Sequence, residues 1–243
     1  GAISRLNGPL TLNGGGILSA PISTTLTIGS VIGGNGGLTK DEAGTAILLE
    51  ANAYSGGTTI TRGILQVGLT NGTSTTASLG SGDITFNPLI GNVAQLSILR
   101  ADDVTISNKI TSAPGASGNI VIGVVGGTSP SRIVTFDNAA NDFQGNITIN
   151  GGALRITNGS ALGIGVKSVR IASNALPALI LDGTSGNISL SSDITYQISS
   201  DGSGINAAAN SGAIVNRAGD NTINGTISQI NGGGGNGRIT VEA

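Results

Sequence analysis

A spaced pattern of six residues occurs twice along this chain and recurs in part a third time. In the two full copies the residues stand at offsets 0, 2, 4, 8, 11 and 13 from an asparagine. The copies are Asn52, Tyr54, Gly56, Ile60, Gly63 and Leu65; Asn141, Phe143, Gly145, Ile149, Gly152 and Leu154; and, in part, Asn221, Ile223, Gly225 and Gly232. Repeats this long indicate a solenoid. We therefore expect 1–243 to form a single solenoid domain of three units, about 1–99, 100–185 and 186–243.

Short runs in which apolar and polar residues alternate predict β-strands throughout the chain. Alternation with a period of two is typical of a half-buried strand, and Asn-Gly, Gly-Gly and Ser-Gly steps between the runs favour tight turns. Seven such runs are 10–12, 26–28, 84–86, 104–106, 120–122, 147–149 and 239–241. Helix-forming residues such as Glu and Lys are scarce, and 42 of the 243 residues are glycine. We expect an all-β fold with little or no α-helix.

A parallel β-solenoid accounts for this pattern. Each strand would pair with its equivalents in the rungs above and below, about 4.8 Å away. Inward side chains would stack into ladders of Val, Ile and Leu, while Thr, Ser and Asn face solvent and Gly turns the corners. With roughly twenty-odd residues in each rung, the chain would form about ten or eleven rungs. We expect Ile60, Leu65, Ile149 and Leu154 to face inward.

The composition excludes several classes of protein. The chain has no His and no Cys, so it cannot form a disulfide, a thiolate or imidazole metal site, or a Ser-His-Asp triad. Its net charge of −2 argues against a nucleic-acid partner, because such partners require clustered Lys and Arg. No segment reaches the ~18 uninterrupted apolar residues of a membrane helix, so we predict no membrane span.

Carboxylates are the remaining candidates for catalysis, since some β-helix enzymes act on polysaccharides with paired acids. The adjacent pair Asp102 and Asp103 is the strongest candidate. Neighbours on a strand face opposite sides, however, and we interpret the pair as a polar turn before Val104. Asp41 and Glu42 are expected to be solvated in a turn. The eleven basic residues are scattered singly and are not expected to stand beside acids, so we predict no catalytic residue.

We also predict no cofactor and no metal site. The glycine runs at 33–37 and 232–237 begin like the calcium-binding nonapeptide of secreted β-rolls, but no aspartate follows at the required position. No helix start follows these runs, so they are not phosphate loops. Tyr54 and Phe143 occupy matching places in the repeat and could form a sugar-binding patch. We expect them instead to close the end of the core beside a corner.

Residues 36–68 resemble the passenger-associated transport repeat of bacterial autotransporter passengers and related surface proteins. The residues that carry the resemblance are Gly36-Gly37-Leu38-Thr39-Lys40, Gly44-Thr45, Leu48, Ala51-Asn52, Tyr54-Ser55-Gly56-Gly57-Thr58-Thr59-Ile60, Gly63 and Leu65-Gln66-Val67. A second copy lies at about 133–156. The chain departs from the family pattern at Glu42 and Glu50, where glycine is usual, and at Ala46, where leucine is usual. The resemblance implies a right-handed parallel β-helix, exported to the outer surface of a Gram-negative bacterium.

Two classes of function fit these observations. The first is a non-catalytic extracellular rod or fibre segment that serves display or adhesion. Because strand-like alternation runs nearly to both ends, we expect the stack to continue, either into flanking parts of a longer passenger or end to end with identical subunits in a filament. The alternative is a surface-exposed β-helix that binds or degrades a surface glycan. The absent His, the scattered basic residues and the lack of a carboxylate cluster favour the first class.

Overall fold

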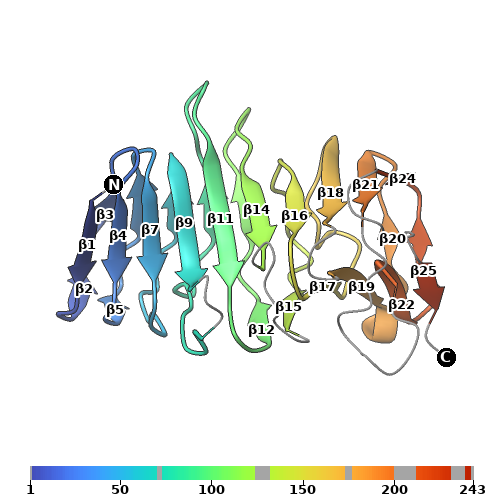
Figure 1. Ribbon diagram of the computed structural model, residues 1–243, viewed down its shortest axis with the longest axis horizontal. Coiled ribbons are helices and arrows are strands. Elements are labelled where there is room, and N and C mark those ends of the chain that lie inside the picture. Colours follow the sequence, from blue (N-terminus) through green and yellow to red (C-terminus); the bar gives the residue numbers. More distant parts are fainter. Residues whose placement is uncertain are drawn as a thin grey trace.

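The computed structural model describes residues 2–69, 73–123, 132–172, 177–199, 212–230 and 239–241. Within these residues the chain is almost entirely β, and the described helical structure is a single 3-10 turn at Gly183–Ser185. The chain winds into a stack of rungs, and the strands of successive rungs pair in parallel (Figure 1). The predicted all-β parallel β-helix is confirmed.

One face of the stack is a ten-stranded sheet that receives one strand from each rung. Its strands are β1 (Ile3–Leu6), β4 (Thr25–Ile28), β7 (Thr45–Leu48), β9 (Gly63–Gly68), β11 (Ala94–Leu99), β14 (Asn119–Ile122), β16 (Ile147–Ile149), β18 (Lys167–Ile171), β21 (Ile194–Ile198) and β24 (Thr226–Gln229). We number rungs 1 to 10 by these strands. Ten rungs agree with the ten or eleven that the chain length predicts.

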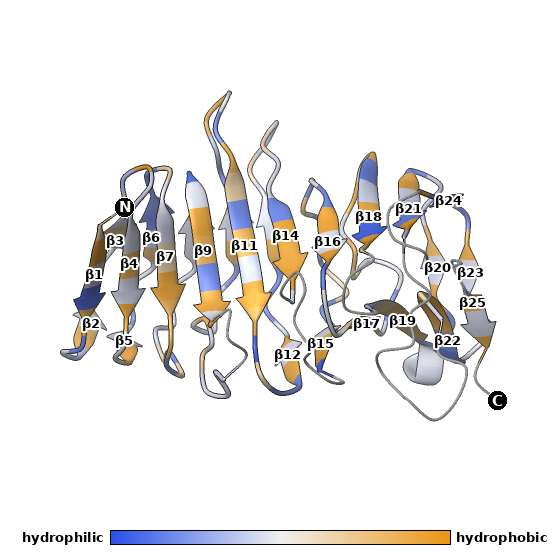
Figure 2. Ribbon diagram, viewed as in Figure 1, coloured by the Kyte–Doolittle hydropathy of each residue, from blue (hydrophilic) through white to orange (hydrophobic). Residues whose placement is uncertain are grey.

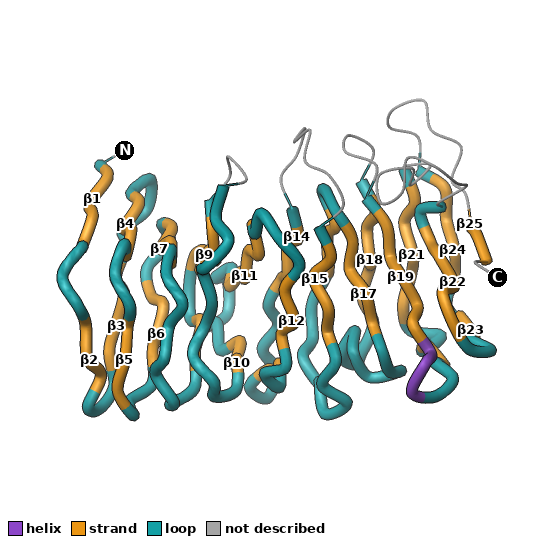
Figure 3. The backbone as a smooth tube through the Cα atoms, turned by 90° about the horizontal axis from the view of Figure 1, so that it is seen from below, coloured by secondary structure: helices purple, strands orange, loops and turns teal. Residues whose placement is uncertain are grey.

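The other faces are divided between the two halves of the chain, and Figure 3 shows their elements following one another along the stack. A five-stranded sheet contains β3 (Gly16–Ser19), β6 (Leu38–Asp41), β8 (Thr58–Ile60), β10 (Ile84–Phe86) and β13 (Ile110–Ser112). A six-stranded sheet contains β12 (Val104–Ile106), β15 (Ile133–Phe136), β17 (Ala153–Ile156), β19 (Ala178–Asp182), β22 (Ile214–Ala218) and β25 (Ile239–Val241). The two short pairs are β2 (Leu10–Leu12) with β5 (Ile32–Gly34), and β20 (Ser189–Leu190) with β23 (Thr222–Ile223).

Ladders of mostly aliphatic residues fill the interior of the stack, and bands of apolar residues cross the ten-stranded sheet from rung to rung (Figure 2). One ladder through rungs 2 to 9 consists of Leu26, Ala46, Leu65, Leu96, Ile120, Ile147, Val169 and Tyr196. A second consists of Ile28, Leu48, Val67, Ile98, Ile122, Ile149, Ile171 and Ile198. The four residues predicted to face inward are fully buried, which confirms the predicted strand register: Ile60, Leu65, Ile149 and Leu154.

Two glycines of the repeat allow successive rungs to pack backbone against backbone. A Cβ atom on Gly56 would lie 2.4 Å from the carbonyl carbon of Gly36, and one on Gly145 would lie 2.2 Å from the carbonyl oxygen of Gly118. Gly145 also has a φ of 118°, which L residues rarely adopt. Both positions therefore need glycine. Gly232, in the third copy, lies outside the described residues.

The two full copies of the repeat occupy different faces of the solenoid. Ile60 lies in β8 of the five-stranded sheet, whereas its counterpart Ile149 lies in β16 of the ten-stranded sheet. In the same way, Leu65 lies in β9 of the ten-stranded sheet and Leu154 in β17 of the six-stranded sheet. All four side chains still face inward. The repeat therefore specifies a corner with its two flanking strands, and that corner can be placed at different positions around the cross-section.

Candidate functional site

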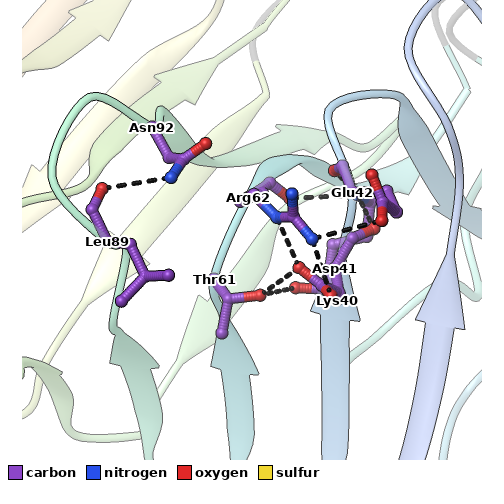
Figure 4. A network of polar contacts seen from close by, with 7 residues as sticks. All are labelled: Lys40, Asp41, Glu42, Thr61, Arg62, Leu89 and Asn92. Atoms are coloured by element: carbon purple, nitrogen blue, oxygen red, sulfur yellow. Dashed lines mark hydrogen bonds and ion pairs between the residues drawn. The ribbon is translucent and has the colours of Figure 1, made fainter.

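A polar network surrounds the corner that leads from β6 into β7 (Figure 4). Lys40 is fully buried, because it follows the alternation of β6 at an inward position. Its ammonium donates hydrogen bonds to the carbonyl oxygens of Asp41 and Glu42, each at 2.7 Å, and of Arg62 at 3.0 Å. Burial lowers the pKa of Lys40 to about 8, although the nearby charges of Asp41 and Glu42 oppose the shift. Lys40 thus satisfies three carbonyls of a corner.

On the outer side of the same corner, Arg62 binds both neighbouring carboxylates. Its Nε and Nη2 lie 2.8 and 3.1 Å from the two carboxylate oxygens of Asp41, and its Nη2 lies 3.2 Å from Oε1 of Glu42. The hydrogen bonds from Arg62, and then those from the Glu42 backbone and the Thr61 hydroxyl, hold the pKa of Asp41 well below its usual range. Asp41 and Glu42 were expected to be solvated in a turn, and their side chains are 32% and 40% exposed; the sequence did not predict that the next rung also brings Arg62 beside them.

Glu42 adopts a φ of 65°, in the left-handed region that favours glycine. This is one of the two positions at which the repeat family usually has glycine, so the turn keeps its geometry although the residue differs. Glu50, the other such position, is not among the residues with positive φ. Of the two glutamates, only Glu42 therefore lies at a position whose backbone conformation favours glycine.

Lys167 is a second buried lysine with the same kind of partners. Its ammonium donates to the carbonyl oxygens of Phe143 at 2.9 Å and Leu162 at 2.8 Å. The ammonium also lies 4.2 Å from the centroid of the Phe143 ring, within the range of a cation–π contact. Burial lowers the pKa of Lys167 to about 8. Sequence reasoning missed both buried lysines, although each stands in phase with inward apolar residues two positions away: Leu38 before Lys40, and Val169 after Lys167.

Asp102 and Asp103 have separate structural partners. Asp102 forms a 2.8 Å ion pair with the buried side chain of Arg100, which also donates to the carbonyls of Thr75 and Ala77. Asp103 accepts a 2.7 Å hydrogen bond from the backbone N–H of Ile133, in the next rung. Both aspartates lie in the turn before β12, as expected.

The expectation that no basic residue stands beside an acid is therefore wrong. Arg62 pairs with Asp41, Arg100 with Asp102, and Lys109 with Asp142 at 2.8 Å. Most of these partners come from different rungs, because stacking brings residues some twenty to thirty positions apart into contact. The pairs join neighbouring segments of the stack and are not gathered into one cluster.

The asparagine that begins each copy of the repeat ties one rung to the rung before it. Its side-chain oxygen accepts a hydrogen bond from an isoleucine N–H. The contacts are Asn52 to Ile32 at 2.8 Å, Asn141 to Ile110 at 2.8 Å, and Asn221 to Ile188 at 2.7 Å. The side-chain nitrogens of Asn52 and Asn141 donate in the other direction, to carbonyls of the following rung. The third copy thus keeps the contact although its sequence has diverged.

All five aromatic residues of the chain are fully buried: Tyr54, Phe86, Phe136, Phe143 and Tyr196. The hydroxyl of Tyr54 lies 2.7 Å from the Thr58 hydroxyl, and the rings of Phe86 and Phe143 lie 6.4 Å apart. Tyr54 and Phe143 were predicted to close the core beside a corner, and their burial agrees with this. They present no ring to a sugar in solution.

Two shallow polar hollows adjoin one another at Gly159, on the outside of the second half of the stack. Their volumes are about 310 and 430 Å³. Hydroxyl and amide side chains line both, with one carboxylate each, Asp193 and Asp137. Across the described ranges, no three Asp or Glu residues gather as a metal site would require. No helix in this part of the chain is long and apolar enough to cross a membrane.

The family model of the Passenger-associated-transport-repeat matches residues 38–67 and 133–156. These are the segments in which we identified the repeat from its residues, so the resemblance is confirmed. Over 252 residues the chain is 28% identical to the Adhesin BmaC autotransporter of Brucella suis biovar 1 (strain 1330). That match includes 86% of this chain and spans 7% of the length of the adhesin. No solved structure matches the chain at a significant level.

Proposed function

This chain carries the passenger-associated transport repeat of autotransporter passengers, and we propose that it is a non-catalytic rod segment of a bacterial surface protein. The segment holds other parts of that protein away from the outer membrane of a Gram-negative cell, and so serves display or adhesion. The residues 1–243 act as one solenoid domain of three units. The similarity to an autotransporter adhesin supports a location outside the cell.

The unbroken pair of core ladders is the observation that carries this proposal. Eight consecutive rungs contribute a buried or half-buried residue to each ladder, from Leu26 to Tyr196 and from Ile28 to Ile198. A continuous apolar core with paired backbones resists bending, as a spacer must. With about 4.8 Å between rungs, ten rungs give a rod about 45 Å long.

The polar groups of the described residues support a structural role. Three buried cations each donate hydrogen bonds to backbone carbonyls and so stabilise corners of the solenoid: Lys40, Arg100 and Lys167. Asp102 and Asp103, the strongest catalytic candidates in the sequence, are engaged by Arg100 and the Ile133 N–H. We propose that the chain has no catalytic, cofactor or metal site.

The glycan-binding alternative has one observation in its favour, the two polar hollows that meet at Gly159. Hydroxyl and amide groups there could hydrogen-bond a sugar. Sugar sites commonly add an aromatic face against which the ring packs, and every aromatic side chain of this protein is inside the core. The hypothesis of a rod segment is therefore better supported than that of a glycan-binding protein.

The partners of the rod lie at its ends. Inward positions become partly exposed in the terminal rungs: Leu6 in β1 and Ile227 in β24 are each 41% exposed. Further rungs would cover these residues and pair the open strand edges. We propose that flanking parts of a longer chain do so, with end-to-end stacking of identical subunits in a filament as the second arrangement.

Electron microscopy of the intact surface protein, with and without residues 2–241, tests the rod function. We expect the deletion to shorten the projecting rod by about 45 Å, with its remaining parts still at the cell surface. On the same bacteria, binding to host cells is compared with and without the deletion. An unchanged rod length would contradict the proposal.

Incubation of the chain with a panel of surface polysaccharides tests the alternative. We expect no shortening of any polysaccharide and no retention on a glycan array. Cleavage or binding that Asp193→Asn or Asp137→Asn abolishes, and that the matched variant Asp220→Asn does not affect, would replace the rod function with a glycan-directed one.

A further inference from the structure

The turns that lead into the ten-stranded sheet carry a periodic row of exposed isoleucines. Ile22 is 75% exposed, Ile90 is 105% exposed and Ile164 is 50% exposed. Each directly precedes a residue with positive φ, and this sharp bend leaves the isoleucine at the outer tip of the turn. The positive-φ residues are Ser23 at 62°, Gly91 at 83° and Gly165 at 78°.

Two of these turns are held rigid by paired hydrogen bonds. The backbone N–H and the hydroxyl of Thr24 both donate to the carbonyl of Pro21, at 3.0 and 2.7 Å. The backbone N–H and the side-chain amide of Asn92 donate to the carbonyl of Leu89 in the same way, at 3.0 and 3.3 Å (Figure 4). Ile22 and Ile90 are therefore presented outward by a defined backbone.

The isoleucine turns recur at every third rung along one edge of the rod. They precede β4, β11 and β18, the strands of rungs 2, 5 and 8, and the edge runs along the upper side of Figure 1. With about 4.8 Å between rungs, the tips are about 14 Å apart. Exposed neighbours enlarge two of the tips: Leu89 and Val93 beside Ile90, and Val166 beside Ile164.

The turns of the intervening rungs place different residues before the positive-φ position. These are Asp41 in rung 3, Arg62 in rung 4, Pro114 in rung 6 and Gln144 in rung 7. None of the four is a large aliphatic residue. The apolar tips are thus a regular feature of rungs 2, 5 and 8, and the turn of rung 5 brings three exposed apolar side chains together, Leu89, Ile90 and Val93.

We propose that this edge pairs side by side with the same edge of a second copy of the chain, in antiparallel orientation. The row is symmetric about rung 5, so a two-fold axis there brings tip 5 onto tip 5 of the partner and tip 2 onto tip 8. Such a surface is its own complement, as an isologous interface must be. A parallel pairing with matched rungs also has a two-fold axis, which runs along the rod, but it would set Asp41 against Asp41 and Arg62 against Arg62, so that like charges meet.

The charges along the edge permit the antiparallel arrangement. It sets rung 3 against rung 7 and rung 4 against rung 6. Asp41 therefore faces Gln144, and Arg62 faces Pro114, so no like charges meet. The contact area is narrow, being made mainly by turn tips, and we expect a concentration-dependent dimer of modest affinity. This pairing is separate from any contact at the ends of the rod.

Single cysteines provide a direct test, because the natural chain has none. After mild oxidation, Ile90→Cys should give a covalent dimer by itself, since tip 5 meets tip 5. Ile22→Cys and Ile164→Cys should give little dimer separately and a dimer when mixed. Pro114→Cys, at the exposed tip of rung 6, is the matched control and measures random collision. Strong self-cross-linking of Ile22→Cys would overturn the antiparallel arrangement.

Sedimentation of the cysteine-free chain provides the second measurement. We expect Ile90→Ser to weaken dimerisation by about tenfold or more while leaving the melting temperature unchanged, because that side chain is already in solvent. The double variant Ile22→Glu with Ile164→Lys should retain the dimer, whereas Ile22→Glu with Ile164→Glu should lose it. A chain that stays monomeric at all concentrations, or equal behaviour of the two double variants, would refute the proposal.

Discussion

The side-chain oxygen of Asn141 accepts a hydrogen bond from the backbone N–H of Ile110, 2.8 Å away and one rung earlier in the stack. The side-chain nitrogen of Asn141 donates to the carbonyl of Ala161 in the following rung, at 3.2 Å. One buried amide therefore connects three successive rungs. Asn52 makes the equivalent contacts to Ile32 and Ser78.

Replacing this amide should weaken the fold. Asn141→Ala leaves the Ile110 N–H and the Ala161 carbonyl without a partner, at about 1–3 kcal/mol for each buried group. The expected result is a lower free energy of unfolding in chemical denaturation. Asn158→Ala removes an amide that donates to the Asp137 carbonyl and accepts from the Ser160 N–H at a solvent-accessible corner, and it is the control, with a smaller loss of about 1 kcal/mol or less. Equal losses would show that the buried amide has no special role.

Removal of the buried ammonium should also destabilise the corner after β6. Lys40→Met keeps most of the aliphatic stem and removes the ammonium donor from three carbonyl oxygens, of which that of Asp41 keeps the Ala20 N–H at 3.3 Å; we expect a loss of about 2–4 kcal/mol. Arg170→Met changes an exposed cation on β18 and should alter stability by less than about 0.5 kcal/mol. Thermal unfolding of both variants measures the difference. A neutral Lys40→Met would mean that water can replace the ammonium.

Stability should rise with pH from about 8 to about 10. Burial lowers the pKa values of Lys40 and Lys167 from 10.5 to about 8, so in this window the unfolded chain binds more protons than the folded one. The free energy of unfolding then increases with pH. Above about pH 10 it should fall again, because burial raises the pKa values of Tyr54 and Tyr196 and the unfolded tyrosines ionise first.

Denaturant titrations at pH 7.5, 9, 10 and 11 measure this profile. The double variant Lys40→Met with Lys167→Met should lose the rise and keep the fall. Stability that declines steadily from pH 8 in the natural chain would contradict the assigned protonation changes.

Substituting glycine should have opposite effects on stability at Glu42 and Glu50, the two positions where the repeat family usually has glycine. Glu42→Gly relieves a left-handed backbone at φ 65° and loses only a half-exposed ion pair with Arg62, so we expect a gain of about 0.5–1 kcal/mol. Glu50→Gly relieves no such strain and should destabilise by about 0.5–1 kcal/mol through chain entropy. Melting temperatures measured side by side test the sign. A loss at residue 42 would show that the ion pair outweighs the strain.

The last test asks whether a Cβ atom is tolerated at two glycine positions. In Gly56→Ala the new methyl would lie 2.4 Å from the Gly36 backbone, and rungs 2 and 3 would have to separate. We expect a loss of about 3 kcal/mol or failure to fold. Gly33→Ala meets nothing within 4 Å and should stay within about 0.5 kcal/mol of the natural chain. Circular dichroism during thermal unfolding distinguishes the two.

The sequence by itself determined the strands and their inward faces. Alternation with a period of two depends only on neighbouring residues. The inward positions of Ile60, Leu65, Ile149 and Leu154 could therefore be predicted without knowing how the rungs stack. Glycine and asparagine spacing also identified the repeat and its family. These are local signals, each contained within about fifteen residues.

Only the tertiary structure determined which residues distant in the sequence are in contact. Rungs differ in length, so equal motifs reach different faces, and Ile60 and Ile149 enter different sheets. Arg62 meets Asp41, and Lys167 meets the Phe143 carbonyl, only because stacking brings distant residues together. The buried lysines follow from the same cause: a corner that leaves carbonyls without strand partners needs a donor, and the rung register determines which side chain can reach them.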